Sequence, residues 1–270
     1  MATIIFATDF SESAQNALIY CSHLADFFKD NLILVHAYTI PFNYAETPVP
    51  IFEMDNIKES AQLNIDKELE KVKALFPELC VSGHVQAGET LDIINHVATK
   101  NTPRLVVFGT SGKGSDTLFW GSVATKALKT LKYPALAVAS DIQWKPISTI
   151  AFAADYENDG SKMPLNAIAN WVNILKAQLK IVHIEVNNNH FKRPEYLEKA
   201  LSSLSPQYFE MQSTHFIETI NDFLAQQEID WLIVVPRKYG FLEGLFRKSR
   251  TKMLAQGSNV PVLALNEISG

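Results

Sequence analysis

Residues 3–13 decide the fold, and their sequence is Thr-Ile-Ile-Phe-Ala-Thr-Asp-Phe-Ser-Glu-Ser. The first five residues are apolar or β-branched without alternation, which predicts a short strand buried on both faces of a sheet. Asp9 to Ser13 contains several good helix N-caps and an acid for the first helical turn. A helix is predicted next, because apolar residues recur every three or four positions from Ala14 to Phe28.

The same alternation of strand and helix continues through the first half of the chain. Further strands are predicted at residues 32–37, 81–86, 105–108 and 135–139, and further helices at 57–76, 91–100 and 122–131. Strands that alternate with helices favour right-handed crossovers and a parallel sheet covered by helices on both faces.

The second half of the chain repeats this order. Strands are predicted at 149–154, 180–186, 209–212, 232–235 and 261–265, with helices near 168–175, 195–204 and 216–226. Landmarks recur at one constant spacing: Gly109 matches Pro236, Ser122 matches Ser249, and Pro134 matches Pro261. An internal duplication is the economical explanation.

We therefore predict an α/β protein of two domains, residues 1–143 and 144–270. Each domain is expected to be a doubly wound, open, parallel five-stranded sheet of Rossmann-like type. The junction near residues 143–146 is too short to act as a flexible tether.

Composition excludes several classes of function. The 270 residues are 47% hydrophobic and 20% charged, with a net charge of −5, so the basic excess of a general nucleic-acid or anionic-membrane binder is missing. No apolar run approaches the ~18 residues needed to span a bilayer, and no signal-peptide core follows the N-terminus. Cys21 and Cys80 are too few for a disulfide framework. We expect a cytoplasmic protein without membrane or nucleic-acid partners.

The most informative loop lies between a predicted buried strand and a helix. It begins Gly109-Thr110-Ser111-Gly112-Lys113-Gly114-Ser115 and continues to Trp120-Gly121-Ser122-Val123. Glycines let backbone amides approach an anion, and the start of the next helix adds free N–H groups. The pattern favours a phosphate-binding loop, assisted by the Ser111, Ser115 and Ser122 hydroxyls. The alternative is a purely structural turn, since neither the Walker A nor the Rossmann glycine pattern is satisfied.

Together these segments resemble the universal stress protein family. The shared features are the strand followed by Asp9-Phe10-Ser11, the strand that contains Val35-His36, and the glycine loop before a final strand that opens after a proline. Family members that bind ATP carry G-x2-G-x9-G-[ST]. Gly109, Gly112 and Gly121-Ser122 match this pattern, although the spacer from Lys113 to Trp120 holds eight residues rather than nine.

The resemblance implies an adenine-nucleotide site in the first half, for ATP or a related nucleotide, with or without Mg²⁺. Thr8 and Asp9 would contact the nucleoside, and Ala37 would line the base pocket. The phosphates would be held by Gly109, Gly112, Gly121, Ser122 and Val123. For Asp9, a role as helix N-cap is the alternative. The resemblance also implies an internal pseudo-dimer paired through the last strands, 135–139 and 261–265, which could form a further homodimer.

The second half lacks the glycines of this loop at the matching positions. Pro236, Tyr239 and Lys248 stand where the first half has glycines, and proline also removes a backbone donor. The surrounding residues are basic, which suits either an anionic partner or an ordinary solvated surface. These residues are Arg237, Lys238, Arg247, Lys248 and Arg250.

The sequence favours binding over catalysis. No positioned base, arginine finger or Walker B acid is evident, so any ATP hydrolysis would be slow. His36 and His183 occupy equivalent strand ends, which indicates a shared structural role rather than metal ligation. The leading hypothesis is an adenine-nucleotide sensor in the stress response. The alternative is a nucleotide-independent protein-interaction module of the same family.

Overall fold

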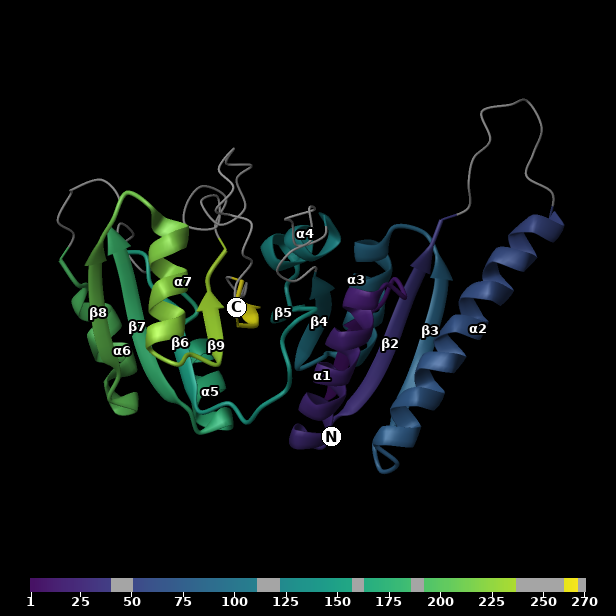
Figure 1. Ribbon diagram of the computed structural model, residues 1–270, viewed down its shortest axis with the longest axis horizontal. Helices are drawn as coiled ribbons and strands as arrows, with labels where there is room; N and C mark the ends of the chain where they lie inside the picture. Colours follow the sequence, from purple (N-terminus) through teal and green to yellow (C-terminus); the bar gives the residue numbers. More distant parts are fainter. Residues whose placement is uncertain (40–50, 111–121, 157–162, 186–191, 237–259, 267–270) are drawn as a thin grey trace.

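The computed structural model describes residues 1–39, 51–110, 122–156, 163–185, 192–236 and 260–266. Within these ranges the chain is a mixed α/β protein with one large, mostly parallel sheet. The strands are ordered β3-β2-β1-β4-β5-β10-β9-β6-β7-β8 (Figure 1). The second half therefore arranges its strands in the same order as the first, outward from a shared centre.

The elements of the first half match the predicted pattern. They are β1 (Thr3–Ala7), α1 (Glu12–Phe28), β2 (Asn31–Tyr38), α2 (Ile51–Leu75), β3 (Val81–Ala87), α3 (Thr90–Asn101), β4 (Leu105–Thr110), α4 (Ser122–Thr130) and β5 (Ala135–Ala139). Helix α2 begins earlier than expected, directly after Pro50. Ile51 and Met54 continue the three-residue apolar spacing upstream of Ile57, so the pattern that predicted the helix extends to its observed start.

The second half contains β6 (Thr149–Ala153), α5 (Leu165–Leu175), β7 (Gln178–Glu185), α6 (Glu195–Leu201) with a 3₁₀ turn (Ser202–Leu204), β8 (Gln207–Gln212), α7 (Phe216–Gln226), β9 (Trp231–Val234) and β10 (Val262–Ala264). Every predicted strand is present. The match of Ser122 with Ser249 involves a residue outside the described ranges.

Each face of the sheet carries its own hydrophobic core. Along β1, Ile4 and Phe6 contribute to one core and Ile5 to the other, as alternation along a strand requires. The first core is completed by α1, α2, α5 and α6, and the second by α3, α4 and α7. Strands covered on both faces explain the continuous apolar runs in the sequence.

The two halves meet through their last strands and form a single sheet. β10 pairs antiparallel with β5, with Leu263 opposite Leu136 and Ala264 opposite Ala135. Pairing through these strands was expected, but two separate five-stranded sheets were also expected. That expectation is corrected, because the backbone hydrogen bonds between β5 and β10 join both halves into one ten-stranded sheet.

Side chains of the first core reinforce this joint. The Trp231 indole Nε1 donates a hydrogen bond of 2.7 Å to the Tyr20 hydroxyl, and both residues are buried. Trp144, in the segment between the halves, stacks on His23 with ring centroids 5.8 Å apart. Asn266, just beyond β10, donates from Nδ2 to the Leu128 and Leu131 carbonyls at the end of α4. The junction is thus packed against the molecule, as its length predicted.

The register of the sheet changes one match between the halves. Leu105 lies opposite Ile4, and Trp231 lies opposite Ile150, so these two residues are equivalent. Counting along both strands makes Val235 the equivalent of Gly109, and Pro236 the equivalent of Thr110. The match of Gly109 with Pro236 is therefore one residue out of register. The reason is that β9 and β10 are separated by one residue more than β4 and β5, since Leu232 pairs with Val262 whereas Val106 pairs with Ala135.

Candidate functional site at the carboxyl edge of the first half

Three neighbouring strands, β2, β1 and β4, bring most of the predicted site residues to one edge of the sheet. Thr8 and Asp9 follow β1, whereas Ala37 and Gly109 lie near the ends of β2 and β4. From β1 the chain adds β2 and β3 on one side, and it then returns to add β4 and β5 on the other side of β1. Open α/β sheets bind ligands at such a switch point. Gly112 and Gly121 lie outside the described residues.

Helix α4 follows the undescribed loop. It begins at Ser122, with Val123 half-buried in its first turn against the second core. The backbone N–H groups at a helix start have no partner within the helix, and they carry the positive end of its dipole. The position of Ser122 and Val123 is thus one that an anion could use.

The turn after β1 is held by the Thr8 hydroxyl. Thr8 N donates to the Val35 carbonyl at 3.0 Å, which continues the β1–β2 ladder. Thr8 Oγ1 accepts a hydrogen bond of 3.1 Å from Phe10 N. Phe10 has a φ of 63°, in the left-handed region that costs a non-glycine residue roughly 1–2 kcal/mol. The Thr8 hydroxyl therefore stabilises a strained turn.

Asp9 lies at the exposed tip of this turn. Its Oδ1 accepts hydrogen bonds from Ser11 N at 3.0 Å and Ser11 Oγ at 2.5 Å. The N-cap of α1 is Ser11, whose Oγ accepts from Ala14 N. The alternative role of Asp9 as N-cap is therefore wrong: Asp9 orients the capping serine, and its carboxylate remains exposed at the sheet edge.

Glu68 of α2 is a site residue that the sequence interpretation missed. It is only 4% exposed, and its Oε1 accepts a hydrogen bond of 3.3 Å from Thr8 Oγ1. Its Oε2 has no hydrogen-bond partner among the described residues. Burial raises the pKa of Glu68 to about 6, against the lowering effects of the Thr8 hydrogen bond and of Lys71, while Asp9 raises it further.

A signal for Glu68 was present in the sequence. The buried residues Ala61, Ile65 and Val72 mark the face of α2 that packs on the sheet. Glu68 lies three residues after Ile65 and four before Val72, so helical periodicity places it on the same face. An acid in an apolar stripe is unusual and invites a functional explanation.

Gly109 has a structural reason to be glycine. A Cβ at this position would lie 2.9 Å from both the Ala14 Cα and the Ser13 carbonyl oxygen. The missing side chain thus lets the start of α1 pack directly on β4. In the second half the equivalent residue is Val235, and α5 begins only at Leu165, well after β6 ends at Ala153. The structural alternative fully accounts for glycine at this position.

The two strand-end histidines have the same structural role, as predicted. His36 Nδ1 lies 2.8 Å from the Thr8 carbonyl oxygen, and His183 Nδ1 lies 3.0 Å from the Ala154 carbonyl oxygen. Since a carbonyl only accepts hydrogen bonds, Nδ1 carries the proton in both rings. Within the described ranges, no group of three or more His, Cys, Asp or Glu side chains could hold a metal ion.

The part of this edge formed by Asp9, Glu68 and Ala37 suits a ligand rich in hydrogen-bond donors. The exposed Asp9 carboxylate and Glu68 Oε2, which has no partner among the residues described, can both accept hydrogen bonds, and the half-buried Ala37 offers a small apolar surface. A ribose with its hydroxyls, or a base with an exocyclic amine, meets this requirement. The residues expected to hold phosphates lie mostly in the loop outside the described ranges.

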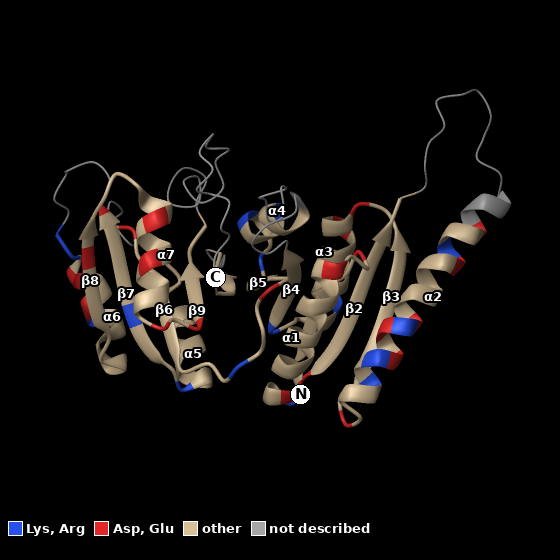
Figure 2. Cartoon of the chain, viewed as in Figure 1, with Lys and Arg blue, Asp and Glu red and all other residues tan. Residues whose placement is uncertain are grey.

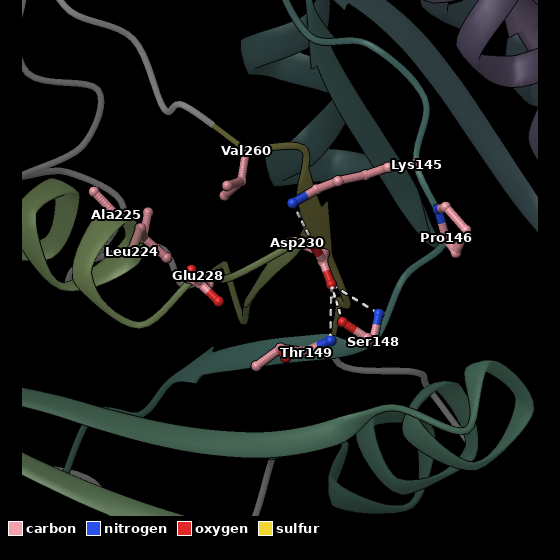
Figure 3. Close-up of a pocket in the computed structure, with 9 residues that line it drawn as sticks. All are labelled: Lys145, Pro146, Ser148, Thr149, Leu224, Ala225, Glu228, Asp230 and Val260. Atoms are coloured by element: carbon pink, nitrogen blue, oxygen red, sulfur yellow. Dashed lines mark hydrogen bonds and ion pairs between the residues drawn. The ribbon is translucent and has the colours of Figure 1, made fainter.

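A separate cavity of about 570 Å³ lies in the second half, at the edge of the sheet where strands β6 and β9 begin (Figure 3). Its polar centre is Asp230, whose Oδ1 contacts Lys145 Nζ at 2.5 Å. Asp230 Oδ2 accepts hydrogen bonds from Ser148 N, Ser148 Oγ and Thr149 N. Because both carboxylate oxygens are engaged, this arrangement anchors the junction between the halves, and we do not assign a ligand to it.

Comparison with known proteins places the fold in a family. A model of the universal stress protein family matches residues 1–139, the part that forms β1 to β5. The chain belongs to the universal stress protein family. No curated protein matches the sequence.

Two of the solved structures compared share this fold over nearly the whole chain. A universal stress protein from Archaeoglobus fulgidus DSM 4304 is 14% identical, with a TM-score of 0.72 over 98% of each chain. A functionally unknown protein from Pseudomonas aeruginosa PAO1 is 11% identical, with a TM-score of 0.57 over 99% of this chain and 93% of its own. A universal stress protein in complex with cAMP is 18% identical over 52% of this chain and 98% of its own, with a TM-score of 0.41.

The surface charge is mixed. Figure 2 shows acidic and basic residues interspersed along α2, whereas α7 carries acidic ones.

In the part of the chain that the structure describes, no helix combines the length and the apolar character that crossing a membrane requires.

Proposed function

We propose that the first half of this universal stress protein binds an adenine nucleotide, ATP or a related one, and acts as a sensor in the stress response. The nucleoside would lie between the Thr8–Asp9 turn and Ala37. The phosphates would lie toward Gly109, the loop with Gly112 and Gly121, and the start of α4 at Ser122 and Val123. Bound Mg²⁺ would add positive charge at the phosphates.

The observation that carries this proposal is the convergence of Thr8, Asp9, Ala37 and Gly109 at one switch point of the sheet. A chain of hydrogen bonds organises the edge, from Glu68 through Thr8 to Phe10. The exposed Asp9 carboxylate then stands ready to accept hydrogen bonds from a ligand. Gly109 contributes by letting the start of α1 approach β4, so that the Asp9 turn and the end of β4 lie at the same edge of the sheet.

We further propose that the chain is two copies of one domain, residues 1–143 and 144–270, and that only the first binds nucleotide. Ala154 replaces Thr8 in the second half, since Ala154 N donates to Val182 O as Thr8 N donates to Val35 O. The second half therefore lacks the hydroxyl that holds the turn. Its basic loop, Arg237 to Arg250, lies outside the described residues.

The alternative function is a nucleotide-independent interaction module of the same family. It is favoured by the eight-residue spacer in the loop and by the structural explanation for Gly109. Under this alternative the first half keeps its fold without a ligand, and a surface of the joined halves binds a protein partner.

Isothermal titration with ATP, ADP and AMP tests the proposal directly. We expect heat of binding for at least one of them, a loss of affinity in Gly121→Lys, and no loss in Asp26→Asn, a change at a charged position on α1. Mass spectrometry of the denatured, freshly purified protein should reveal a retained nucleotide if binding is tight. No heat with any of the three nucleotides would leave the interaction module as the better account.

A further inference from the structure

Glu68 is buried at a free-energy cost that the fold does not recover. An ionised carboxylate removed from water is destabilising unless several hydrogen bonds or a close cation compensate. Here Oε1 has one hydrogen bond, at the long distance of 3.3 Å, and Oε2 has none among the described residues. A leucine would fit the apolar stripe of α2 better, so stability alone does not explain this acid.

The Glu68 carboxyl group contacts the edge that carries Asp9 through Thr8. The Thr8 hydroxyl has one proton, which it donates to Glu68 Oε1, and it accepts the Phe10 N–H. Thr8 therefore has no second proton for Oε2. The contact with Thr8 brings the Glu68 carboxyl group next to the turn that carries Asp9, and the Asp9 charge contributes to the raised pKa of Glu68.

The other ionisable groups packed around Glu68 are engaged elsewhere or act from a distance. Lys71, one turn further along α2, lowers the pKa of Glu68 by its charge but makes no ion pair with it among the described contacts. On β2, His36 bonds to the Thr8 carbonyl. On β3, His84 bonds to Gln86. The missing partner for Oε2 must then come from outside this set.

We propose that Glu68 is a ligand-binding residue, and that its Oε2 accepts a hydrogen bond from a donor of the bound nucleoside. The donor is either a ribose hydroxyl or the exocyclic amine of the base. This inference rests on the proposed nucleotide function and adds a specificity-determining residue from α2 to it. The ligand thereby satisfies a buried oxygen that has no partner within the described part of the chain, and a site built this way rejects analogues that lack the donor.

Proton binding to Glu68 should weaken this contact. The ionised form is the better acceptor, and its population falls as the pH drops through about 6. Affinity for the nucleotide should therefore be highest above neutral pH and should decrease in mild acid. Protonation of the phosphates occurs in the same range, so the wild type must be compared with variants at each pH.

The experiment is a titration of each nucleotide into wild type, Glu68→Gln and Glu68→Leu, at about pH 7.5 and about pH 5. Glu70→Gln is the matched control, since Glu70 is exposed on the same helix. At the higher pH both Glu68 variants should bind about tenfold or more weakly, as expected for loss of a hydrogen bond to a charged group. The difference from wild type should shrink at the lower pH, and the control should behave as wild type at both.

Ligand analogues identify the donor. We expect wild type to bind at least one of the 2′-deoxy, 3′-deoxy and inosine analogues of the best nucleotide about tenfold more weakly, among them the analogue that lacks the donor to Glu68. Glu68→Leu should bind that analogue and the parent nucleotide equally. A merely structural role of Glu68 would not make the effect of the missing donor depend on Glu68 in this way. Glu68→Gln serves as the second, more conservative variant if Glu68→Leu fails to fold.

The outcomes separate the two proposals. If wild type binds nucleotide and both Glu68 variants bind equally well, the role of Glu68 is overturned while the nucleotide function stands. If the variants lose affinity equally for every analogue, Glu68 shapes the site without touching the ligand, and the inference is again overturned. If wild type binds no adenine nucleotide, both proposals fall.

Discussion

At the scale of single residues, Glu68 links pH to stability. Its pKa of about 6 in the folded protein exceeds the ordinary value of 4.5, so the folded state binds the proton more tightly than the unfolded state. Proton binding to Glu68 therefore stabilises the fold. This stabilisation is fully present below the pKa of the unfolded state and is lost as the pH rises through the pKa of the folded state. At one pKa unit per about 1.36 kcal/mol, ionised Glu68 costs the folded protein at most about 2 kcal/mol at neutral pH.

Glu68→Gln is therefore expected to be more stable than wild type at neutral pH, by up to about 2 kcal/mol, and to converge with it in acid. Urea denaturation of both proteins without ligand, at several pH values, measures this difference. Glu70→Gln should show no such trend. A stability difference that stays constant across the pH range would contradict a raised pKa for Glu68.

Gly109 shows how one missing side chain positions a helix. Gly109→Ala should destabilise the protein by about 2 kcal/mol, because the new Cβ meets backbone atoms of Ser13 and Ala14 rather than a movable side chain. Thermal unfolding measures the change, with Ala37→Gly as a comparison that removes volume at the same edge. A melting temperature equal to that of wild type would show that α1 does not approach β4 so closely.

At the scale of elements, the sequence predicted the strands and helices well because their apolar patterns are strong. Runs such as Leu105 to Phe108 are long enough and apolar enough to specify strands buried on both faces. The two features that the sequence-based prediction missed depend on contacts between elements. The role of Glu68 follows from α2 lying over Thr8, and the equivalence of Gly109 with Val235 follows from sheet register, which a constant spacing along the sequence does not reveal.

The junction between the halves is anchored by Asp230, the residue before β9. Burial by itself raises the pKa of Asp230, but the hydrogen bonds from Lys145, Ser148 and Thr149 outweigh burial and lower it below 3.8. Because its pKa is lowered by folding, Asp230 stabilises the protein at any pH above its pKa in the unfolded state. This stability is lost as the pH falls through its pKa in the folded state. The anchor should thus hold at neutral pH and fail only in strong acid.

Asp230→Ala should destabilise the protein by about 2 kcal/mol, since it removes the carboxylate that accepts hydrogen bonds from the Ser148 and Thr149 amides. Lys145→Ala should cost less than about 1 kcal/mol, because the Lys145 side chain is 62% exposed. Urea denaturation of the two variants checks the ranking. Equal losses would mean that the ion pair, rather than the backbone hydrogen bonds, anchors the junction.

At the scale of the whole molecule, the pairing of β5 with β10 covers a sheet edge that would otherwise be open. All five residues of β5 are buried, and an uncovered apolar edge strand readily pairs with another chain. β5 could take the place of β10 in a second copy, because Leu136 lies opposite Leu263 with Ala135 and Ala137 on either side. An antiparallel pair of identical strands is also compatible with two-fold symmetry.

Residues 1–143 produced alone should therefore form a homodimer in which β5 pairs with β5. Light scattering after size-exclusion chromatography gives the mass, and circular dichroism shows whether the piece is folded. If the nucleotide site belongs to the first half, this dimer should bind one nucleotide per chain with the affinity of the full-length protein. A folded monomer would show that β5 does not need a covering strand, and β10 would then join the halves without being required for the stability of the first.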